Sequence, residues 1–274
     1  IPTTASNYNA TIETQKFAYK AGLTINVNTS GATPTWTLSI YQRNADGSIK
    51  YNASGVPLTT TVTYTGANNF VSAENYATSG SGSNINVTGG MYDARRAQGL
   101  DLVKIDIGKL NTVLNNSSGT KASDWNNVAA NTPANWWNGI LYVKFSDGTP
   151  RATDGVEVPV DGYGVQLTNG TTIPNPSYTQ SQGIYGTTIA TNNALYVAGN
   201  YNADGNSATG TNGTTDSASE PPASLAADSI TILSTSWSNA MSARDLSSRV
   251  ASNFTEVSAA FLTGIVPSDN QNNN

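Results

Sequence analysis

The chain has 274 residues and a net charge of −5, and only 11% of its residues are charged. It contains no cysteine and no histidine, which excludes disulfide bonds, thiolate metal sites and a Ser-His-Asp catalytic triad. The few basic residues argue against nucleic acid as a partner, and no apolar run approaches the length of a membrane span.

The first 87 residues read as a β-rich region of unknown type. Apolar and polar residues alternate over 23–29, over 35–42 and over 58–66, as in half-buried strands. In the third segment the threonines are expected on the solvent face. The Asp-Gly pair inside 44–48 is a strong signal for a turn between strands.

A strand that leads directly into a helix is predicted over residues 100–116. The segment 100–107 alternates apolar with polar residues, which favours a strand. Leu110, Val113 and Leu114 then recur at helical spacing, so we expect one short α-helix near 108–116.

Short apolar segments bounded by Gly, Asn, Asp or Pro follow in the second half of the chain. Within 187–202, two strands flank a polar Thr-Asn-Asn corner, which is typical of the rungs of a β-solenoid. We therefore predict a mainly β fold, a parallel β-helix-like solenoid, although no fixed repeat period is detectable. An antiparallel β-sandwich is the alternative.

Residues 203–222 are poor in apolar side chains and are predicted to form a polar insertion. The other apolar segments are 140–145, 164–170, 227–234 and 257–266.

The spacing Asn200-x-Asn202-x-Asp204-Gly205 resembles the start of a calcium loop. A calcium-binding loop of that type needs a carboxylate at its twelfth position, where this chain has Thr211. We therefore interpret the residues of this spacing as corner residues between strands rather than as calcium ligands. Apart from calcium, the sequence suggests no cofactor. We expect Asn200 and Asn202 to adopt turn or left-handed backbone conformations.

Paired carboxylates could support a carbohydrate-active enzyme on a β-helix, because glycoside hydrolysis needs neither cysteine nor histidine. Such an enzyme requires two acids within about 10 Å in a groove, which we would expect beside Trp136 or Trp137. Solvated surface acids are the simpler interpretation. The candidates are Asp93, Asp101, Asp106, Asp154, Glu157, Asp161 and Asp228.

The adjacent Trp136 and Trp137 are candidates for a platform that stacks against glycans. Adjacent tryptophans more often divide between the core and its edge, and that interpretation competes with sugar binding. Arg95 and Arg96 are most simply a surface ion-pairing site near Asp93.

Six motifs follow one another along the second part of the chain: "MYDARRAQGLDLVKIDIGKLNTVL" (91–114), "GILYVKF" (139–145), "GVQLTNGTTIPNPS" (164–177), "TIATNNALYVAGNYN" (188–202), "PASLAADSITILSTSWSNA" (222–240) and "TEVSAAFLTGIVPS" (255–268). Together they resemble the C-terminal domain of bacterial PilX-type, prepilin-like surface proteins. The resemblance spans about residues 88–268, so we expect a pilus-associated domain over 88–274 that is separate from 1–87.

The resemblance implies an extracellular protein of the bacterial cell surface, associated with a fimbrium of the type IV pilus kind. We expect a structural or adhesive module with no enzymatic activity, whose partners are other surface or pilus proteins, further copies of itself, or glycans. A glycan-binding module, a carbohydrate-active enzyme and a filament subunit are the alternatives. Because the chain starts at Ile1 and lacks the prepilin helix of its look-alikes, we expect that its ends have been trimmed.

Overall fold

Strands are the main regular structure of the computed structural model, at 46% against 13% helix, and the helices are short. The mainly β class predicted from the sequence is therefore confirmed. The structure describes residues 15–31, 33–42, 44, 48–64, 69–115, 125–126, 136–145, 162–181, 183–203, 220–249 and 253–264.

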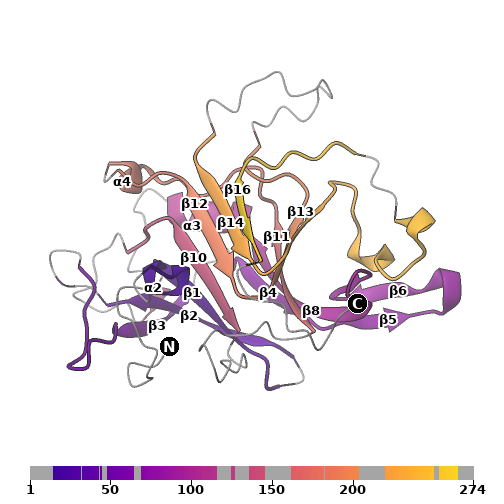
Figure 1. Ribbon diagram of the computed structural model, residues 1–274, viewed down its shortest axis with the longest axis horizontal. Coiled ribbons are helices and arrows are strands. Elements are labelled where there is room, and N and C mark those ends of the chain that lie inside the picture. The colour runs from indigo at the N-terminus through magenta and orange to yellow at the C-terminus, as the bar shows by residue number, and fades with distance from the viewer. Residues whose placement is uncertain are drawn as a thin grey trace.

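The larger of two main sheets has eight strands within the described residues (Figure 1). Its first five strands in spatial order are parallel, and β1, β2, β3 and β9 continue it as an antiparallel meander. The order is β16 (Ala260–Thr263), β14 (Ala223–Ala227), β12 (Thr187–Thr191), β10 (Ile140–Phe145), β1 (Leu23–Asn28), β2 (Thr35–Tyr41), β3 (Thr59–Tyr64) and β9 (Trp125–Asn126).

The smaller main sheet has six strands within the described residues, and a separate hairpin projects beside it (Figure 1). Four of its strands are parallel, while β4 and β7 pair antiparallel with β8. The strands are β15 (Ile230–Leu233), β13 (Ala194–Ala198), β11 (Tyr163–Thr168), β8 (Gln98–Asp106), β4 (Val71–Glu74) and β7 (Met91–Asp93); the hairpin consists of β5 (Ala77–Ser79) and β6 (Asn86–Gly89).

The predicted helix is present as α3 (Ile107–Asn115), and it follows β8 without a loop. The carboxylate of Asp106 accepts a 2.9 Å hydrogen bond from the backbone N–H of Lys109, which satisfies one of the free donors of the first turn. The other helices that the structure describes are single turns: α2 (Phe17–Lys20), α4 (Ser177–Gln180), and the 3-10 turns η1 (Gly82–Asn84), η4 (Asn239–Met241) and η5 (Leu246–Ser248).

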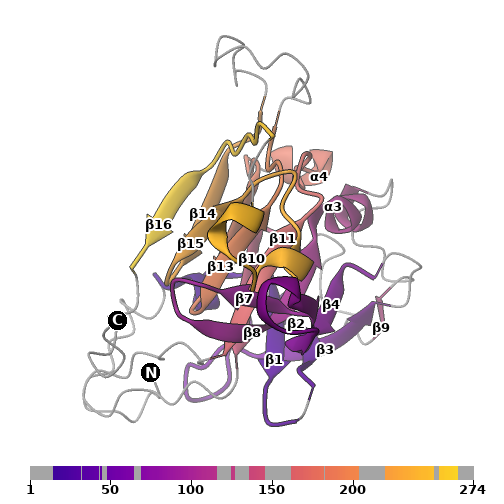
Figure 2. The same cartoon turned by 90° about the vertical axis from the view of Figure 1, so that its right-hand side faces the viewer.

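From β10 to β16, consecutive strands of the chain belong alternately to the larger and the smaller sheet (Figure 2). Within each sheet, these strands lie side by side in chain order. Asn192–Asn193 join β12 to β13, and Asp228–Ser229 join β14 to β15 in the same manner. A third line of parallel bridges connects Gly170, Tyr201 and Val257. These pairings are parallel, so they do not fit the alternative of an antiparallel sandwich.

The larger of two hydrophobic clusters within the described residues takes side chains from both main sheets and forms the core between them. The register of the larger sheet aligns Leu23, Leu141, Ile189 and Leu225 in a single row, and all four are fully buried. Alternation along each strand places every second side chain on this inner face. The smaller sheet contributes residues such as Val165 to the same core.

The predicted division at residue 87 does not match the packing. That position lies inside β6, and strands from both sides of it share both main sheets. β1 pairs with β10, and β4 pairs with β8. The N-terminal strands therefore complete the same core rather than build one of their own. Most of the predicted polar insertion, 204–219, lies outside the described residues.

Candidate functional site

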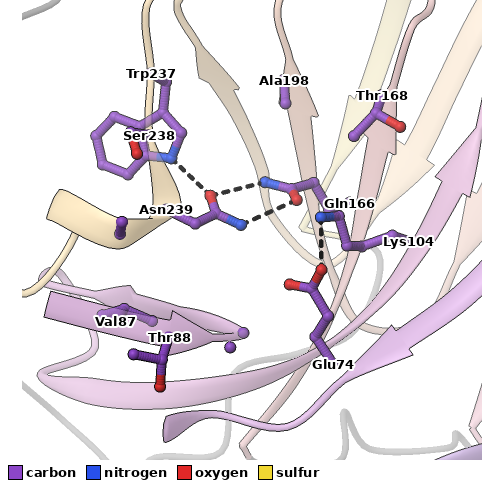
Figure 3. A pocket seen from close by; sticks show the side chains of 13 residues that line it. Glu74, Val87, Thr88, Lys104, Gln166, Thr168, Ala198, Trp237, Ser238 and Asn239 are labelled. Carbon is purple, nitrogen blue, oxygen red and sulfur yellow. Dashed lines mark hydrogen bonds and ion pairs between the residues drawn. The ribbon is translucent and has the colours of Figure 1, made fainter. Parts of the chain in front are cut away.

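A pocket of about 400 Å³ opens on the outer face of the smaller sheet, and we call it the amide pocket (Figure 3). Strands β4, β8, β11 and β13 form its floor. The end of β6 and residues 237–240 form the opposite wall. Its volume falls in the range of sites that hold small molecules.

The floor carries polar side chains because alternation turns them away from the core. Lys104 and Gln166 are register partners on neighbouring strands, and both line the pocket. The ammonium of Lys104 forms a 2.9 Å ion pair with Glu74. This pair is partly exposed, so it contributes little to stability and remains within reach of a ligand.

Two side-chain amides face each other in the pocket, as Figure 3 shows. Gln166 donates to Asn239 and Asn239 donates to Gln166, both over 3.1 Å. The indole N–H of Trp237 donates to the same Asn239 oxygen at 2.9 Å. The Asn239 oxygen therefore accepts two hydrogen bonds and has no acceptor position left. Among the described contacts, each amide nitrogen has one N–H that is not used, and the Gln166 oxygen has one acceptor position that is not used.

The wall opposite the sheet is fixed by hydrogen bonds from residues far away in sequence. The hydroxyl of Ser242 accepts from the backbone N–H of Tyr92 at 2.9 Å and donates to the backbone oxygen of Asn239 at 2.6 Å. Arg244 donates to the backbone oxygen of Ile85 and to the side chain of Asn86. The pocket is therefore held in shape before any ligand arrives.

The chemistry of the amide pocket suits a neutral ligand that is rich in hydroxyl groups. Amide donors and acceptors, a lysine ammonium, the hydroxyls of Thr88 and Thr168, and an indole edge are present together. Its described lining includes a single carboxylate, Glu74. A pair of acids for glycoside hydrolysis is not found among these lining residues.

Trp136 and Trp137 do not form the stacking platform that the sequence suggested. The structure buries both side chains, leaving 1% and 2% of them exposed, within the core between the sheets. Neither ring offers a face to a sugar, because other core side chains surround both. The competing interpretation expected one ring in the core and the other at its edge, whereas both rings lie in the core.

Asp101 and Asp106, two of the candidate acids within the described residues, accept structural hydrogen bonds. Asp101 accepts from the backbone N–H of Tyr76 at 2.6 Å, and Asp106 caps α3 and also accepts from Asn169. Burial raises the pKa of Asp228, and the charge of Arg96 only partly offsets this rise. Asp154, Glu157 and Asp161 lie outside the described residues.

Among the candidate acids that the structure describes, Asp93 alone is almost fully buried, with 4% of its side chain exposed. Arg95 donates to it through its backbone N–H, Nε and Nη2, and forms an ion pair of 3.2 Å. The expected ion pair near Asp93 is therefore present and involves Arg95.

The residues of the calcium-like spacing act as corner residues where they are described. Asn202 has a positive φ of 51°, and its side chain donates to the backbone oxygens of Pro221 and Ser258, both at 2.9 Å. The side chain of Asn200 accepts from the backbone N–H of Glu256 at 3.0 Å. Asp204 lies outside the described residues. Over the described part of the chain, no three acidic, histidine or cysteine side chains cluster as metal ligands.

Comparison with known proteins assigns no relative: no family model, no curated protein and no solved structure matches the chain. In the described part of the chain, no helix is long and apolar enough to cross a membrane.

The residues of the amide pocket were not singled out from the sequence. Gln166 lies in the motif 164–177 and Trp237 in the motif 222–240, and 70 residues lie between these two side chains in the sequence. Only the parallel order of the strands brings them together. A glutamine in the middle of an otherwise apolar strand was the one available signal.

Proposed function

We propose that this chain is an extracellular, non-catalytic adhesive module that binds glycans in the amide pocket. The observation that carries the proposal is the reciprocal amide pair of Gln166 and Asn239, fixed by Trp237 beside an ion pair. Sugar hydroxyls both donate and accept, and planar amides can meet them in both roles.

We also propose that the fold is a short β-solenoid that presents this pocket. Three lines of parallel pairing and two-residue corners between the sheets support this architecture. Stacking consecutive rungs gives a rigid base, on which side chains from neighbouring strands keep fixed spacing.

A place on a bacterial surface appendage completes the proposal. The motifs within 188–202 and 222–240 are the parts of the chain that most resemble pilus-associated surface proteins. These same segments form four neighbouring strands, the corner at Tyr201 and the Trp237–Asn239 wall of the pocket. The resemblance and the pocket therefore involve the same part of the fold.

Filament formation is a second candidate, favoured by apolar side chains on the outermost strands. Phe261 and Leu262 on β16 are 46% and 49% exposed, and Ile232 on β15 is 48% exposed. An edge strand of this kind can pair with another chain. Electron microscopy and light scattering of the purified chain at increasing concentration test it: growing assemblies that Phe261→Ser abolishes would support it, whereas a monomer at all concentrations would contradict it.

Calorimetric titration with neutral oligosaccharides, cellobiose, lactose and diacetylchitobiose, tests the glycan proposal. Ala198→Tyr should abolish binding, because its side chain would fill the pocket from β13. Lys104→Gln should weaken binding by about tenfold, the effect of losing one charged hydrogen bond.

The matched control is Lys109→Gln, which also removes a lysine from an ion pair, but on α3. It should bind like the unchanged chain. Binding that survives Ala198→Tyr in a folded variant would show that sugars bind elsewhere, and no binding of any neutral sugar would reject the proposal.

A further inference from the structure

A second pocket, of about 260 Å³, shares Trp237 with the amide pocket, and we call it the arginine pocket. Strand β7 and the residues after it line one side, and β15 with Ser234 lines the other. Arg95 and Arg249 both contribute to the lining. Its remaining walls are largely apolar or aromatic, including Met91, Ile232 and Leu233.

Arg95 is a cation held in a fixed orientation. Its Nε and Nη2 donate to the carboxylate of Asp93, and that carboxylate also accepts from the buried hydroxyl of Tyr196. An arginine carries five N–H donors, so three of them remain beyond these two bonds. The side chain of Arg95 is 56% exposed, which leaves those donors available at the pocket.

Arg249 follows the single turn η5 and reaches the same pocket. Its Nε has no hydrogen-bond partner within the described residues, and no ion pair to its guanidinium occurs there. A guanidinium with no carboxylate opposite it is a ready partner for an anionic group.

The balance of charge also favours an anion. The lining of the arginine pocket contains two arginines and one carboxylate, Asp93, whose hydrogen bonds are already satisfied from within the protein. This leaves one positive charge in excess, in a chain whose net charge is −5 and which has only 13 basic residues.

We infer that the arginine pocket binds the carboxylate of an acidic sugar, with a neighbouring neutral sugar in the amide pocket. The inference rests on the proposed function in that it assumes a glycan ligand. A carboxylate matches the planar fork of arginine, and the apolar walls with Trp237 can pack against one sugar ring. Because Trp237 lines both pockets, adjacent units of one oligosaccharide can occupy them.

Cellobiose and cellobiouronic acid provide a matched pair of probes, since they differ only in a hydroxymethyl group against a carboxylate. The unchanged chain should bind the acid about tenfold more tightly than the neutral sugar. Arg249→Gln should remove that preference, so that the variant binds the two sugars with equal affinity. Arg95→Lys should reduce the preference, because lysine keeps the charge but not the fork.

Lys20→Gln, on α2 outside both pockets, is the control for loss of one positive charge and should keep the full preference. Equal affinity for the two sugars would contradict the inference and leave the glycan proposal standing. Acid binding that is lost in Arg249→Gln but survives Ala198→Tyr would support a carboxylate site in the arginine pocket, but it would contradict both the amide-pocket proposal and the placement of one oligosaccharide across the two pockets. Tighter binding of a carboxylate-terminated tripeptide than of cellobiouronic acid would overturn the choice of a sugar ligand.

Discussion

The phenol of Tyr196 donates a 2.5 Å hydrogen bond to the carboxylate of Asp93, joining β13 to β7 across 103 residues of sequence. Tyr196 lies on the outer face of the smaller sheet and is only 1% exposed. Burial and the bond to Asp93 raise the pKa of Tyr196, so the phenol stays protonated and remains a donor. The bond therefore holds β7 against the sheet and positions Arg95.

Two buried tyrosines should respond differently to the same substitution. Tyr196→Phe removes a donor to a buried carboxylate and should lower the free energy of unfolding by about 2 kcal/mol. Tyr201 is also fully buried, but its hydroxyl has no hydrogen-bond partner among the described residues. Tyr201→Phe should therefore be neutral or stabilising, because it removes an unpaired polar group.

Urea unfolding of both variants at neutral pH measures the difference. The two changes remove the same single oxygen from a buried ring, so each acts as the control for the other. An equal loss of stability in the two would show that the bond between Tyr196 and Asp93 contributes nothing beyond packing.

Asp93 should make the stability of the protein depend on pH in the acid range. Burial raises the pKa of this carboxyl, but the hydrogen bonds from Arg95 and Tyr196 and the charge of Arg95 outweigh burial, so the pKa lies below its ordinary value. A lowered pKa contributes stability above the pKa of the unfolded chain, about 3.9. That contribution is lost as the pH falls through the lower pKa of the folded state.

Asp93→Asn should be less stable than the unchanged chain at pH 7, and the gap should narrow as the pH falls below about 4. Thermal unfolding at a series of pH values from 7 to 2 measures this gap. If the difference in stability between Asp93→Asn and the unchanged chain stayed constant over the whole pH range, the negative charge of Asp93 would not be what stabilises the fold.

Some strands could be predicted from the sequence because their side chains alternate, and others because they form short apolar segments between polar turns. Leu23–Asn28 and Ile140–Phe145 each show a buried residue at every second position. In β3 only Val62 is fully buried, and the threonines beside it, Thr61 and Thr63, face solvent as expected. The Asn192–Asn193 corner was also predicted, since its short polar side chains suit a turn.

Other features depend on partners that are distant in sequence. The strands β4 to β7 are three or four residues long and carry too few side chains to show a period. Trp136 and Trp137 carry no local sign of which face they occupy, so a core position and a surface platform look alike. The amide pair of Gln166 and Asn239 exists only because strand order and a short 3-10 turn bring them together.

Gly186 and Gly162 each precede a strand with a positive φ, of 73° and 79°, but their surroundings differ. A Cβ at Gly186 would collide with the backbone oxygen of Pro222, whereas nothing lies within 4 Å of a Cβ at Gly162. Gly162→Ala should therefore cost about 1 kcal/mol from the backbone conformation alone. Gly186→Ala should cost clearly more, because the backbone at Pro222 must shift as well.

Chemical denaturation of the two glycine variants under the same conditions checks this ordering. If Gly186→Ala were no less stable than Gly162→Ala, the close approach between the segments before β12 and β14 would not exist in solution.

In the row of aligned side chains of the larger sheet, truncation to alanine should cost less stability on the outermost strand, β16, than on β14. Leu225 on β14 is fully buried, and its register partner Phe261 on β16 is 46% exposed. Leu225→Ala should lower the free energy of unfolding by about 3 kcal/mol, since it leaves a cavity in the core. Phe261→Ala removes a larger side chain but should cost less, because that ring is only half removed from water.

Urea unfolding at low protein concentration, where chains do not associate, compares the two variants. A greater loss for Phe261→Ala would mean that something covers β16 in solution, and repeating the comparison at high concentration would show whether that cover is a second copy of the chain.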